Sequence, residues 1–364
     1  MTRVLHLMPT DADFQTARAV EQLSVGSAGQ NVVVTIGHGG TYPTALAAGI
    51  ALRRRRHGSD ATAIVHAWGG EALIVAALAT RGPLVYSPAP SPSKRSVRWA
   101  RAVAGHREVQ VVCPTSTLRR LHVERGVALE RCHLIRPGVD FARIKRRRNP
   151  ALRAALGLAE SDVVLLVPGE STREAHHERA LWAAAILGEL DPKYRLLLWG
   201  RGPRAVVCER FAVKLHQSDL AVLAEQRLGR RVEFEELLAA TDIVLATPRG
   251  LVPTLPLSIC MAAALPIVST TTYTATELLA NRHTALLVTK PVPRLLAQRV
   301  LELLDDRGIQ WTISDMARTE AYEYFAQTRF LEQFRALYRQ VAGGEKAHVP
   351  EPSPGAGLRF HGRG

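Results

Sequence analysis

Short apolar strand patterns alternate with longer helical patterns along most of this chain of 364 residues. In the first part of the chain, strand patterns occupy residues 4–8, 31–36, 63–66, 84–86, 109–112 and 133–135. Helical patterns lie between them, at residues 14–23, 44–56, 73–80, 93–104 and 116–124. Apolar runs such as NVVVTI are typical of strands that helices cover on both faces. The alternation predicts a parallel sheet flanked by helices, which is a doubly wound α/β domain.

The same alternation restarts after a segment with the composition of a linker. Residues 137–150 combine two prolines and a glycine with a run of basic residues. Beyond it, strand patterns lie at residues 163–167, 195–199, 242–246, 266–269 and 284–288, and helical patterns at 174–190, 292–304 and 309–341. We therefore expect two Rossmann-like α/β domains in tandem, residues 1–148 and 149–318. The tail at 343–364 is rich in Gly and Pro and is predicted to be disordered.

Positive charge is concentrated in the first of these domains. The chain has 47 Lys and Arg against 33 Asp and Glu, and residues 1–148 hold 22 of the basic and 9 of the acidic ones. The basic runs lie at residues 53–56, 94–101 and 145–148. Nucleic-acid binding normally places aromatic side chains among such cations, and this domain offers few. The charge therefore favours an anionic acceptor or an anionic membrane surface over nucleic acid.

Cysteine spacing and hydropathy indicate the compartment. The four cysteines are scattered without a Cys-x-x-Cys pair, so we expect buried thiols in a reducing environment. The start MTRVLHLMP lacks the apolar stretch of a signal peptide, and no window of about 18 apolar residues predicts a membrane-spanning helix. These features predict a cytoplasmic protein, with the basic domain as the part that would touch the inner face of a membrane.

Several stretches resemble a known family. In the second half they are HLIRPGVDFARI, VVLLVPGESTREAHHERALWAAAIL, RLLLWGRGP, and the series EELLAATDIVLATP, CMAAALPIVST and TELLANRHTALLV. Their order and spacing resemble the motifs of the family-4 (group 1) retaining glycosyltransferases. In the first half, AIVHAWGGEALIVAAL and GPLVYS also resemble segments of that family, so the resemblance covers roughly residues 1–340.

This resemblance implies a fold, an activity and a set of partners. The fold is GT-B, two facing Rossmann-like domains, with a C-terminal helix at residues 319–342 that crosses back to the first domain. The activity is transfer of a sugar from a nucleotide-diphosphate sugar to an acceptor, with retention and with neither metal ion nor cofactor. The donor phosphate deprotonates the acceptor and backbone amides stabilise the leaving group, so catalysis depends on positioning and no catalytic residue is assigned.

The glutamate pair of the family is absent. Its two members, eight positions apart, bind the donor sugar and the ribose, and they align with Leu251 and Ile259. Apolar side chains accept no hydrogen bond from a hydroxyl group. An alternative interpretation therefore stays open, in which the chain is a catalytically inactive homologue that serves as a binding or scaffold protein.

The diphosphate clamp of the family is altered as well. Its glycine is kept as Gly169, but Glu170 stands at the position of its arginine, and its lysine position falls at His176 or the residue before. A carboxylate in front of a diphosphate repels it. The cations that would replace the clamp are protonated His176 and His177 and the arginines Arg173, Arg201 and Arg249.

Two further candidates follow the strand at 266–269. Glu277 matches a glutamate that the family places after a glycine-rich turn, and here Thr272 and its neighbours supply hydroxyl groups instead. The resemblance implies that Thr272 and Glu277 contact the donor. The alternative is a plain strand-to-helix connection capped by Thr274 or Thr276.

The remaining candidates lie in the first half. His66 ends its strand where the family lines the acceptor cleft, and the alternative is a hydrogen-bonded structural histidine. Asp11 and Asp13 superficially resemble a metal-binding Asp-x-Asp, but capping of the next helix is favoured, so no metal site is predicted. The glycine-rich run at residues 37–40 is interpreted as a loop at the cleft edge, because no Gly-x-Gly-x-x-Gly follows the first strand.

Overall fold

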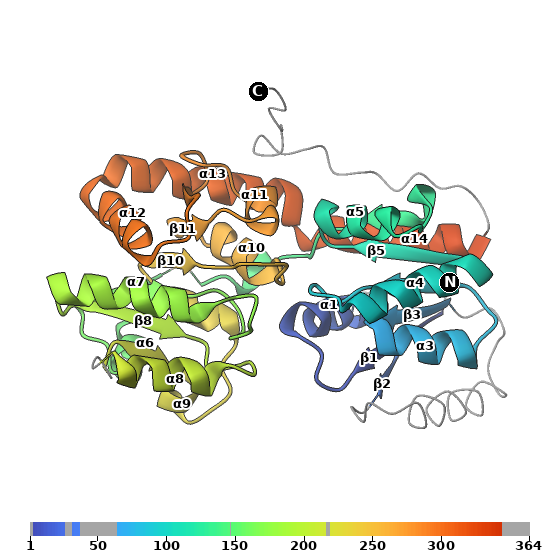
Figure 1. Cartoon of the computed structure of the whole chain (residues 1–364), viewed down its shortest axis with the longest axis horizontal. Coiled ribbons are helices and arrows are strands. Elements are labelled where there is room, and N and C mark those ends of the chain that lie inside the picture. The colour runs from blue at the N-terminus through green and yellow to red at the C-terminus, as the bar shows by residue number, and fades with distance from the viewer. Residues whose placement is uncertain (1–2, 26–30, 37–63, 146, 216–218, 344–364) are drawn as a thin grey trace. The chain divides into compact units, whose positions relative to one another are not determined.

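The computed structural model describes residues 3–25, 31–36, 64–145, 147–215 and 219–343. The helix predicted at residues 44–56, the glycine-rich loop at 37–40, the basic run at 53–56 and the C-terminal tail lie outside these described residues. Figure 1 shows helices on both sides of each sheet.

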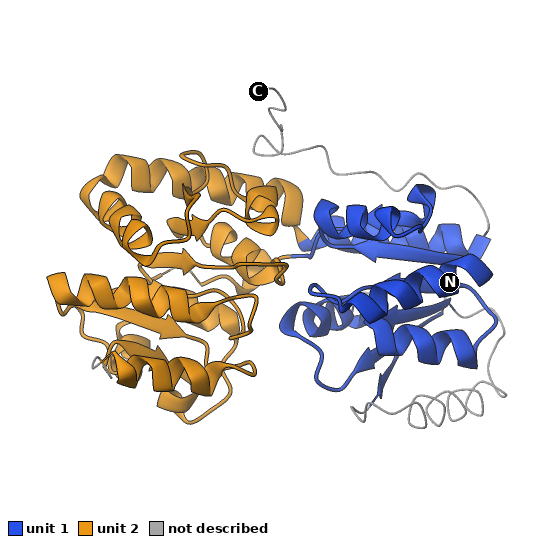
Figure 2. Cartoon of the chain, in the orientation of Figure 1, with its two compact units in different colours: residues 1–138, 327–353 blue, residues 139–326, 354–364 orange. Residues whose placement is uncertain are grey.

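The chain divides into two compact units (Figure 2). Unit 1 comprises residues 1–138 and 327–353, and unit 2 comprises residues 139–326 and 354–364. The chain enters unit 2 beside the place where it leaves, because the Val139 N–H donates to the Phe325 carbonyl at 2.6 Å. The predicted domain ends at residues 148 and 318 both fall within unit 2.

Unit 1 is built on a parallel sheet of six strands in the order β2-β1-β3-β4-β5-β6. The strands are β1 (Val4–Pro9), β2 (Asn31–Ile36), β3 (Ile64–Trp68), β4 (Leu84–Ser87), β5 (Val109–Cys113) and β6 (Cys132–Leu134). The described helices are α1 (Phe14–Val25), α3 (Gly70–Ala79), α4 (Lys94–His106), α5 (Ser116–Glu124), the 3₁₀ turn η1 (Leu129–Arg131) and α14 (Gln327–Gly343). Every residue of β3, β4 and β5 is buried, as expected for central strands covered on both faces.

The C-terminal helix α14 completes the core of unit 1. Its Phe330, Phe334, Leu337 and Tyr338 are buried in one cluster with side chains of α1, β1 and β3. The start of this helix lies close to the backbone of Gly138. A Cβ on Gly138 would lie 2.9 Å from the Phe330 Cβ and 3.0 Å from the Gln327 Cα, so only glycine permits this close approach. The last of the described helices therefore packs in the core of unit 1.

Unit 2 is built on a second parallel sheet, in the order β12-β11-β10-β7-β8-β9. The strands are β7 (Val163–Leu166), β8 (Tyr194–Leu198), β9 (Ala221–Leu223), β10 (Ile243–Ala246), β11 (Ile267–Thr270) and β12 (Leu286–Val288). The α-helices are α6 (Pro150–Ala155), α7 (His177–Leu190), α8 (Ala205–Lys214), α9 (Ala224–Leu228), α10 (Leu255–Ala262), α11 (Tyr273–Leu278), α12 (Pro293–Asp305) and α13 (Arg307–Phe325). Two 3₁₀ helices, η2 (Phe141–Arg143) and η3 (Phe234–Ala240), complete the unit.

The strand orders locate the ligand-binding edges of both sheets. In unit 2 the chain runs from β7 outward to β8 and β9, then returns to β10 on the other side of β7. In unit 1 the same reversal separates β1 from β3. Open α/β sheets bind ligands outside the carboxyl ends of the strands at such a reversal. The predicted class, two doubly wound Rossmann-like domains, is confirmed.

Local predictions fared unevenly. The strand at residues 31–36 and the helix at 116–124 have the predicted bounds, and the long final helical pattern breaks at Ala326 between α13 and α14. The prediction that a helix begins near residue 174 was wrong, because α7 begins at His177. Helices α6, α8 and α9 and strand β9 were not predicted.

Candidate functional site

A pocket opens at the carboxyl ends of β7 and β10, where the strand order of unit 2 reverses. It holds about 480 Å³ of space between atoms, part of it open to solvent. Residues 167–170 after β7 and residues 246–248 after β10 form two of its sides. Most of the remaining wall is apolar and comes from the start of α10 and the loop before it, through Val252, Pro253, Pro256 and Leu257.

Gly169 shapes the floor of this pocket. Its backbone has φ +84, which L side chains rarely adopt, and a Cβ there would lie 3.2 Å from the Pro256 Cγ. Glu170 follows it and also lines the pocket. The structure thus brings both residues of the predicted motif into the pocket, with a carboxylate where the family carries a guanidinium group.

The N-terminus of α7 lies beside the pocket without a side-chain cap. His176 occupies the cap position in a left-handed conformation, with φ 53 and ψ 49. The His176 carbonyl accepts hydrogen bonds from the Thr247 hydroxyl and from the Arg179 N–H, both at 3.0 Å. Residues after β10 therefore hold the loop before α7 in place.

His177, which was predicted from the sequence, beside His176, as a cation for the diphosphate when protonated, lines the pocket and is 1% exposed. Its Nδ1 lies 2.9 Å from the Ser171 hydroxyl, while its Nε2 has no hydrogen-bond partner among the described residues. Burial lowers the pKa of His177 to about 4, so the ring is neutral at pH 7. The pair His176-His177 in the sequence was the signal, but only the structure distinguishes the buried ring.

Arg201 is committed to packing within unit 2. Its guanidinium group pairs with Glu225 at 2.7 Å, donates to the Val232 carbonyl at 3.2 Å, and lies 4.4 Å from the centre of the Trp199 ring. It does not line the pocket. Arg204 is also bound to an acidic side chain of unit 2, since its Nε donates to Glu178 at 2.8 Å.

Arg249 and Arg173 are the exposed cations of the two loops beside the pocket. The Arg249 N–H donates to the Glu174 carbonyl at 2.9 Å, which fixes its backbone beside the loop that precedes α7. Arg173 lies in that same loop. Among the predicted cations, these two and His176 are therefore the ones that the structure brings near the pocket.

Thr272 directly precedes α11 and Glu277 lies on it, and neither residue lines the pocket. Thr272 caps this helix by accepting from the Ala275 N–H at 3.1 Å, so the prediction of a cap at Thr274 or Thr276 was wrong. Glu277 is 7% exposed. The turn that precedes α11 is thus a capped strand-to-helix connection.

The two positions of the missing glutamates differ in their surroundings. Ile259 is 2% exposed and lies in the fully buried helix α10, whereas Leu251 is half-buried in the loop before that helix. A carboxylate at Ile259 would require a buried partner. The apolar wall formed by Val252 and Pro253 follows Leu251 directly.

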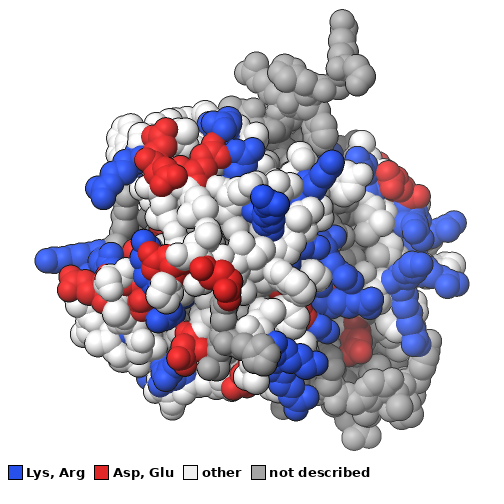
Figure 3. Space-filling view, turned by 60° about the vertical axis from the view of Figure 1, so that its left-hand side comes forward, with Lys and Arg blue, Asp and Glu red and all other residues white. Residues whose placement is uncertain are grey.

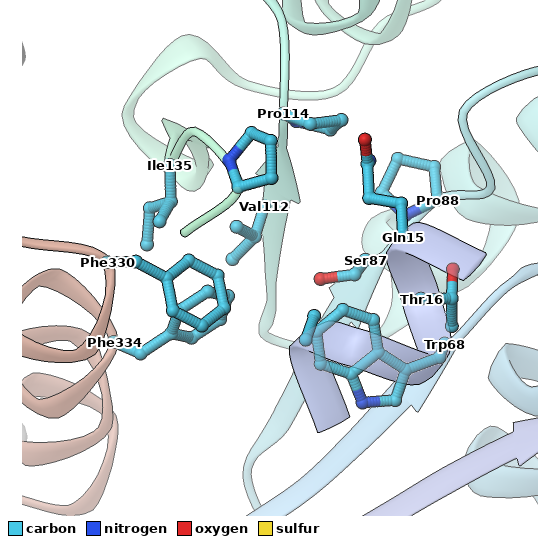
Figure 4. Close-up of a pocket in the computed structure, with 12 residues that line it drawn as sticks. Gln15, Thr16, Trp68, Ser87, Pro88, Val112, Pro114, Ile135, Phe330 and Phe334 are labelled. Atoms are coloured by element: carbon cyan, nitrogen blue, oxygen red, sulfur yellow. The ribbon is translucent and has the colours of Figure 1, made fainter. Parts of the chain in front are cut away.

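Unit 1 has its own pocket at the carboxyl ends of its strands (Figure 4). The figure shows the rings of Phe330 and Phe334 from α14 on one side and the indole of Trp68 on another. The polar members of the lining are Gln15, Thr16 and Ser87, and none of its described residues carries a charge. This pocket suits an uncharged group with an apolar face.

His66 lies behind this pocket in the core of unit 1. It is 0% exposed, its Nδ1 lies 2.7 Å from the Tyr338 hydroxyl and its Nε2 lies 2.9 Å from the Ser87 hydroxyl. Its ring stacks on Trp68 with centres 4.1 Å apart. Burial holds the pKa of His66 well below its usual range. The ring supports the pocket residues Trp68 and Ser87.

The Asp-x-Asp segment caps a helix. The Asp13 carboxylate accepts from the Thr16 N–H at 3.1 Å and from the Thr16 hydroxyl at 2.8 Å at the start of α1. The described residues contain no group of three or more His, Cys, Asp or Glu that could hold a metal ion. All four cysteines are free and buried. No helix among the described residues is long and apolar enough to cross a membrane.

Comparison with known proteins agrees with this architecture. Residues 149–323 match the family model described as glycosyl transferases group 1. The chain is 24% identical over 234 residues to N-acetyl-alpha-D-glucosaminyl L-malate synthase of Bacillus anthracis, a match that covers 62% of this chain and 60% of that protein.

Solved structures match over nearly the whole chain. Alr3699/HepE from Anabaena, determined in complex with UDP and glucose, has a TM-score of 0.77 at 18% identity and covers 92% of this chain and 98% of its own. Sucrose-phosphate synthase from Thermosynechococcus elongatus has a TM-score of 0.74 at 15% identity, covering 94% of this chain and 100% of its own.

The two Rossmann-like units and the pocket at the strand reversal define a protein of the GT-B glycosyltransferase fold. Within this fold, the match to the group 1 glycosyl transferases covers residues 149–323. The family resemblance predicted from the sequence is thereby confirmed.

Proposed function

We propose that this chain transfers a sugar from a nucleotide-diphosphate sugar to an acceptor, with retention and without a metal ion. The observation that carries the proposal is the pocket at the β7–β10 reversal, inside the segment that matches the family. The likeness to a structure determined with UDP and glucose supports a nucleotide-sugar donor. Backbone positioning would do most of the catalytic work, because no carboxylate stands at Leu251 or Ile259.

For the acceptor, we propose that unit 1 supplies the site. Its pocket lined by Trp68 and Phe334 would hold an uncharged part of the acceptor. Any anionic part would lie on the basic surface of α4 and α5, whose exposed cations are Lys94, Arg95, Arg98, Arg101, Arg120 and Arg125. Figure 3 shows Lys and Arg gathered on part of the surface, with Asp and Glu mixed among them elsewhere. The curated relative is named for a malate conjugate, and malate carries carboxylates.

The same basic surface supports our proposal that the protein acts in the cytoplasm and binds the inner face of a membrane. Each cation near an anionic leaflet contributes about 1 kcal/mol. Flotation with phosphatidylglycerol vesicles tests this proposal. We expect binding that is lost in the triple variant Arg95→Gln, Arg98→Gln, Arg101→Gln and absent with phosphatidylcholine. Equal binding to both lipids would contradict it.

Two observations favour a second candidate function, an inactive homologue that binds a nucleotide without transfer. Glu170 lines the pocket where the family has its arginine, and Ile259 is buried where the family has a glutamate. In that case a nucleotide would bind without loss of its sugar.

Calorimetric titration of the full chain with UDP, GDP and ADP tests the donor site. We expect one nucleotide to bind with a micromolar Kd. Millimolar or absent binding of all three would overturn the proposed function. Tight binding without release of nucleoside diphosphate from any nucleotide sugar would favour the inactive homologue.

A further inference from the structure

Two arginine side chains beside the donor pocket lack acidic partners. Arg179 lies in the first turn of α7, and Arg249 follows β10. Among the described residues, neither guanidinium group has an ion pair or a hydrogen bond. Burial lowers the pKa of Arg179, and the nearby charge of Arg249 lowers it further. Like charges held together without compensation favour the binding of an anion between them.

Hydrogen bonds join the two segments that carry these arginines. The Arg249 N–H donates to the Glu174 carbonyl at 2.9 Å, and the Arg179 N–H donates to the His176 carbonyl at 3.0 Å. The Thr247 hydroxyl donates to that same His176 carbonyl at 3.0 Å. The backbones of the two loops, together the rim of the site, are therefore joined close to the points from which both arginine side chains extend.

The charges around His176 show that this rim is cationic. Burial lowers the pKa of His176, as do the guanidinium groups of Arg179, Arg249 and Arg204, while only the Glu178 carboxylate raises it. That carboxylate is already paired with Arg204, so it does not neutralise the charges of Arg179 and Arg249. The uncapped N-terminus of α7, a helix of 14 residues, adds its own positive end.

A buried imidazole inside the pocket also points to a ligand. His177 is 1% exposed, and its Nε2 has no partner among the described residues. When the Ser171 hydroxyl donates to Nδ1, the proton of the neutral ring lies on Nε2. A buried donor without an acceptor costs about 1–3 kcal/mol, and a phosphate oxygen in the pocket would remove that cost.

We propose that Arg179 and Arg249, with the N-terminus of α7 and His177, form the phosphate site of this protein. The ligand class is a diphosphate, either that of a nucleotide or inorganic pyrophosphate. This inference rests on the proposed function and deepens it. The family carries the two cations of its clamp at other positions. Here one cation stands in the first turn of α7 and the other in the loop after β10. The acids near this rim are Glu170, Glu174 and the Arg204-paired Glu178, so both arginines are needed to keep it attractive to a dianion.

Calorimetric titration of the full chain with inorganic pyrophosphate and with UDP tests this site. We expect Arg179→Ala and Arg249→Ala each to weaken both probes at least tenfold. Arg210→Ala, which removes an exposed arginine from α8, is the matched control and should bind like the original chain. A loss of UDP alone, with pyrophosphate unchanged, would show that the arginines act on the nucleoside and would overturn the proposal.

Thermal unfolding of the same variants separates a ligand site from a structural role. Removing one of two repelling charges should leave the Tm unchanged or raise it. A lower Tm, together with unchanged binding, would show that the arginines only support the fold and would overturn the inference. Nucleotide-sugar turnover that survives both substitutions would refute this site but not the proposed function. Pyrophosphate binding that depends on both arginines, in a chain without turnover, would refute the function but not this site.

Discussion

Gly202 allows two loops of unit 2 to pack closely against each other, and an alanine at this position should disrupt that packing. The Gly202 backbone has φ +101, and a Cβ would lie 2.6 Å from both the nitrogen and the oxygen of Ser171. Two backbone hydrogen bonds depend on this contact, from the Ser171 N–H to the Arg201 carbonyl at 2.8 Å and from the Arg204 N–H to the Ser171 carbonyl at 2.9 Å. Because all these clashing atoms belong to the backbone, no side chain can rotate away.

The magnitude follows from two terms. A positive φ costs an L residue about 1–2 kcal/mol, and each lost hydrogen bond costs about 1 kcal/mol. Gly202→Ala should therefore lower the free energy of unfolding by about 3–4 kcal/mol, as measured by urea denaturation. Gly229→Ala is the matched control, because Gly229 has φ +63 but no atom within 4 Å of the added Cβ. It should cost only about 1 kcal/mol of strain. Equal effects of the two substitutions would refute this account of the contact.

Three other predictions concern stability. As the pH falls from 6.5 to the pKa of His177, about 4, this residue should lower the free energy of unfolding by about 1.4 kcal/mol per pH unit, because the unfolded ring binds the proton first. In a pH series of urea denaturations, the free energy of unfolding should therefore fall less steeply with pH in His177→Gln. An unchanged dependence on pH would contradict the assignment. Phe334→Ala, at a ring that is 1% exposed, should cost about 3–5 kcal/mol and loosen α14 in hydrogen exchange, whereas Trp311→Ala, at a ring that is 68% exposed, should not. Arg153→Leu should cost about 3–5 kcal/mol by chemical denaturation, because it leaves the carbonyl groups of Ala240, Ala159 and Asp162 without their donor; a loss below about 1 kcal/mol would show that water replaces Arg153.

Periodicity alone located most of the sheet framework. Central strands such as β5 are continuous apolar runs, because helices cover both of their faces. Strand β9 was missed because its three residues lead directly into helix α9 at Ala224, so the sequence shows no separate strand pattern there. Helix α8 was missed because Val206, Val207 and Val213 are exposed, so its apolar residues do not mark one buried face.

The sequence predicted where the candidate site lies, but not which side chains come together in it. The motif around Gly169 pointed to the correct loop, since a glycine at φ +84 is a requirement of the backbone there. Arg201 and Arg249 look alike in the sequence, because each closely follows a strand. Only the structure shows that Arg201 is paired with Glu225, while the Arg249 N–H donates to the loop before α7. Arg179 was missed because the predicted helix began three residues too early.

The central claim is that unit 2 holds a nucleotide sugar and that its sugar leaves with retention. The most direct test follows the first sugar released from UDP-, GDP- and ADP-glucose by proton NMR, before the anomers equilibrate. The account predicts that one donor yields free α-glucose and nucleoside diphosphate, and that Arg249→Ala slows this release. Release of β-glucose first, or no release from any donor, would contradict the account.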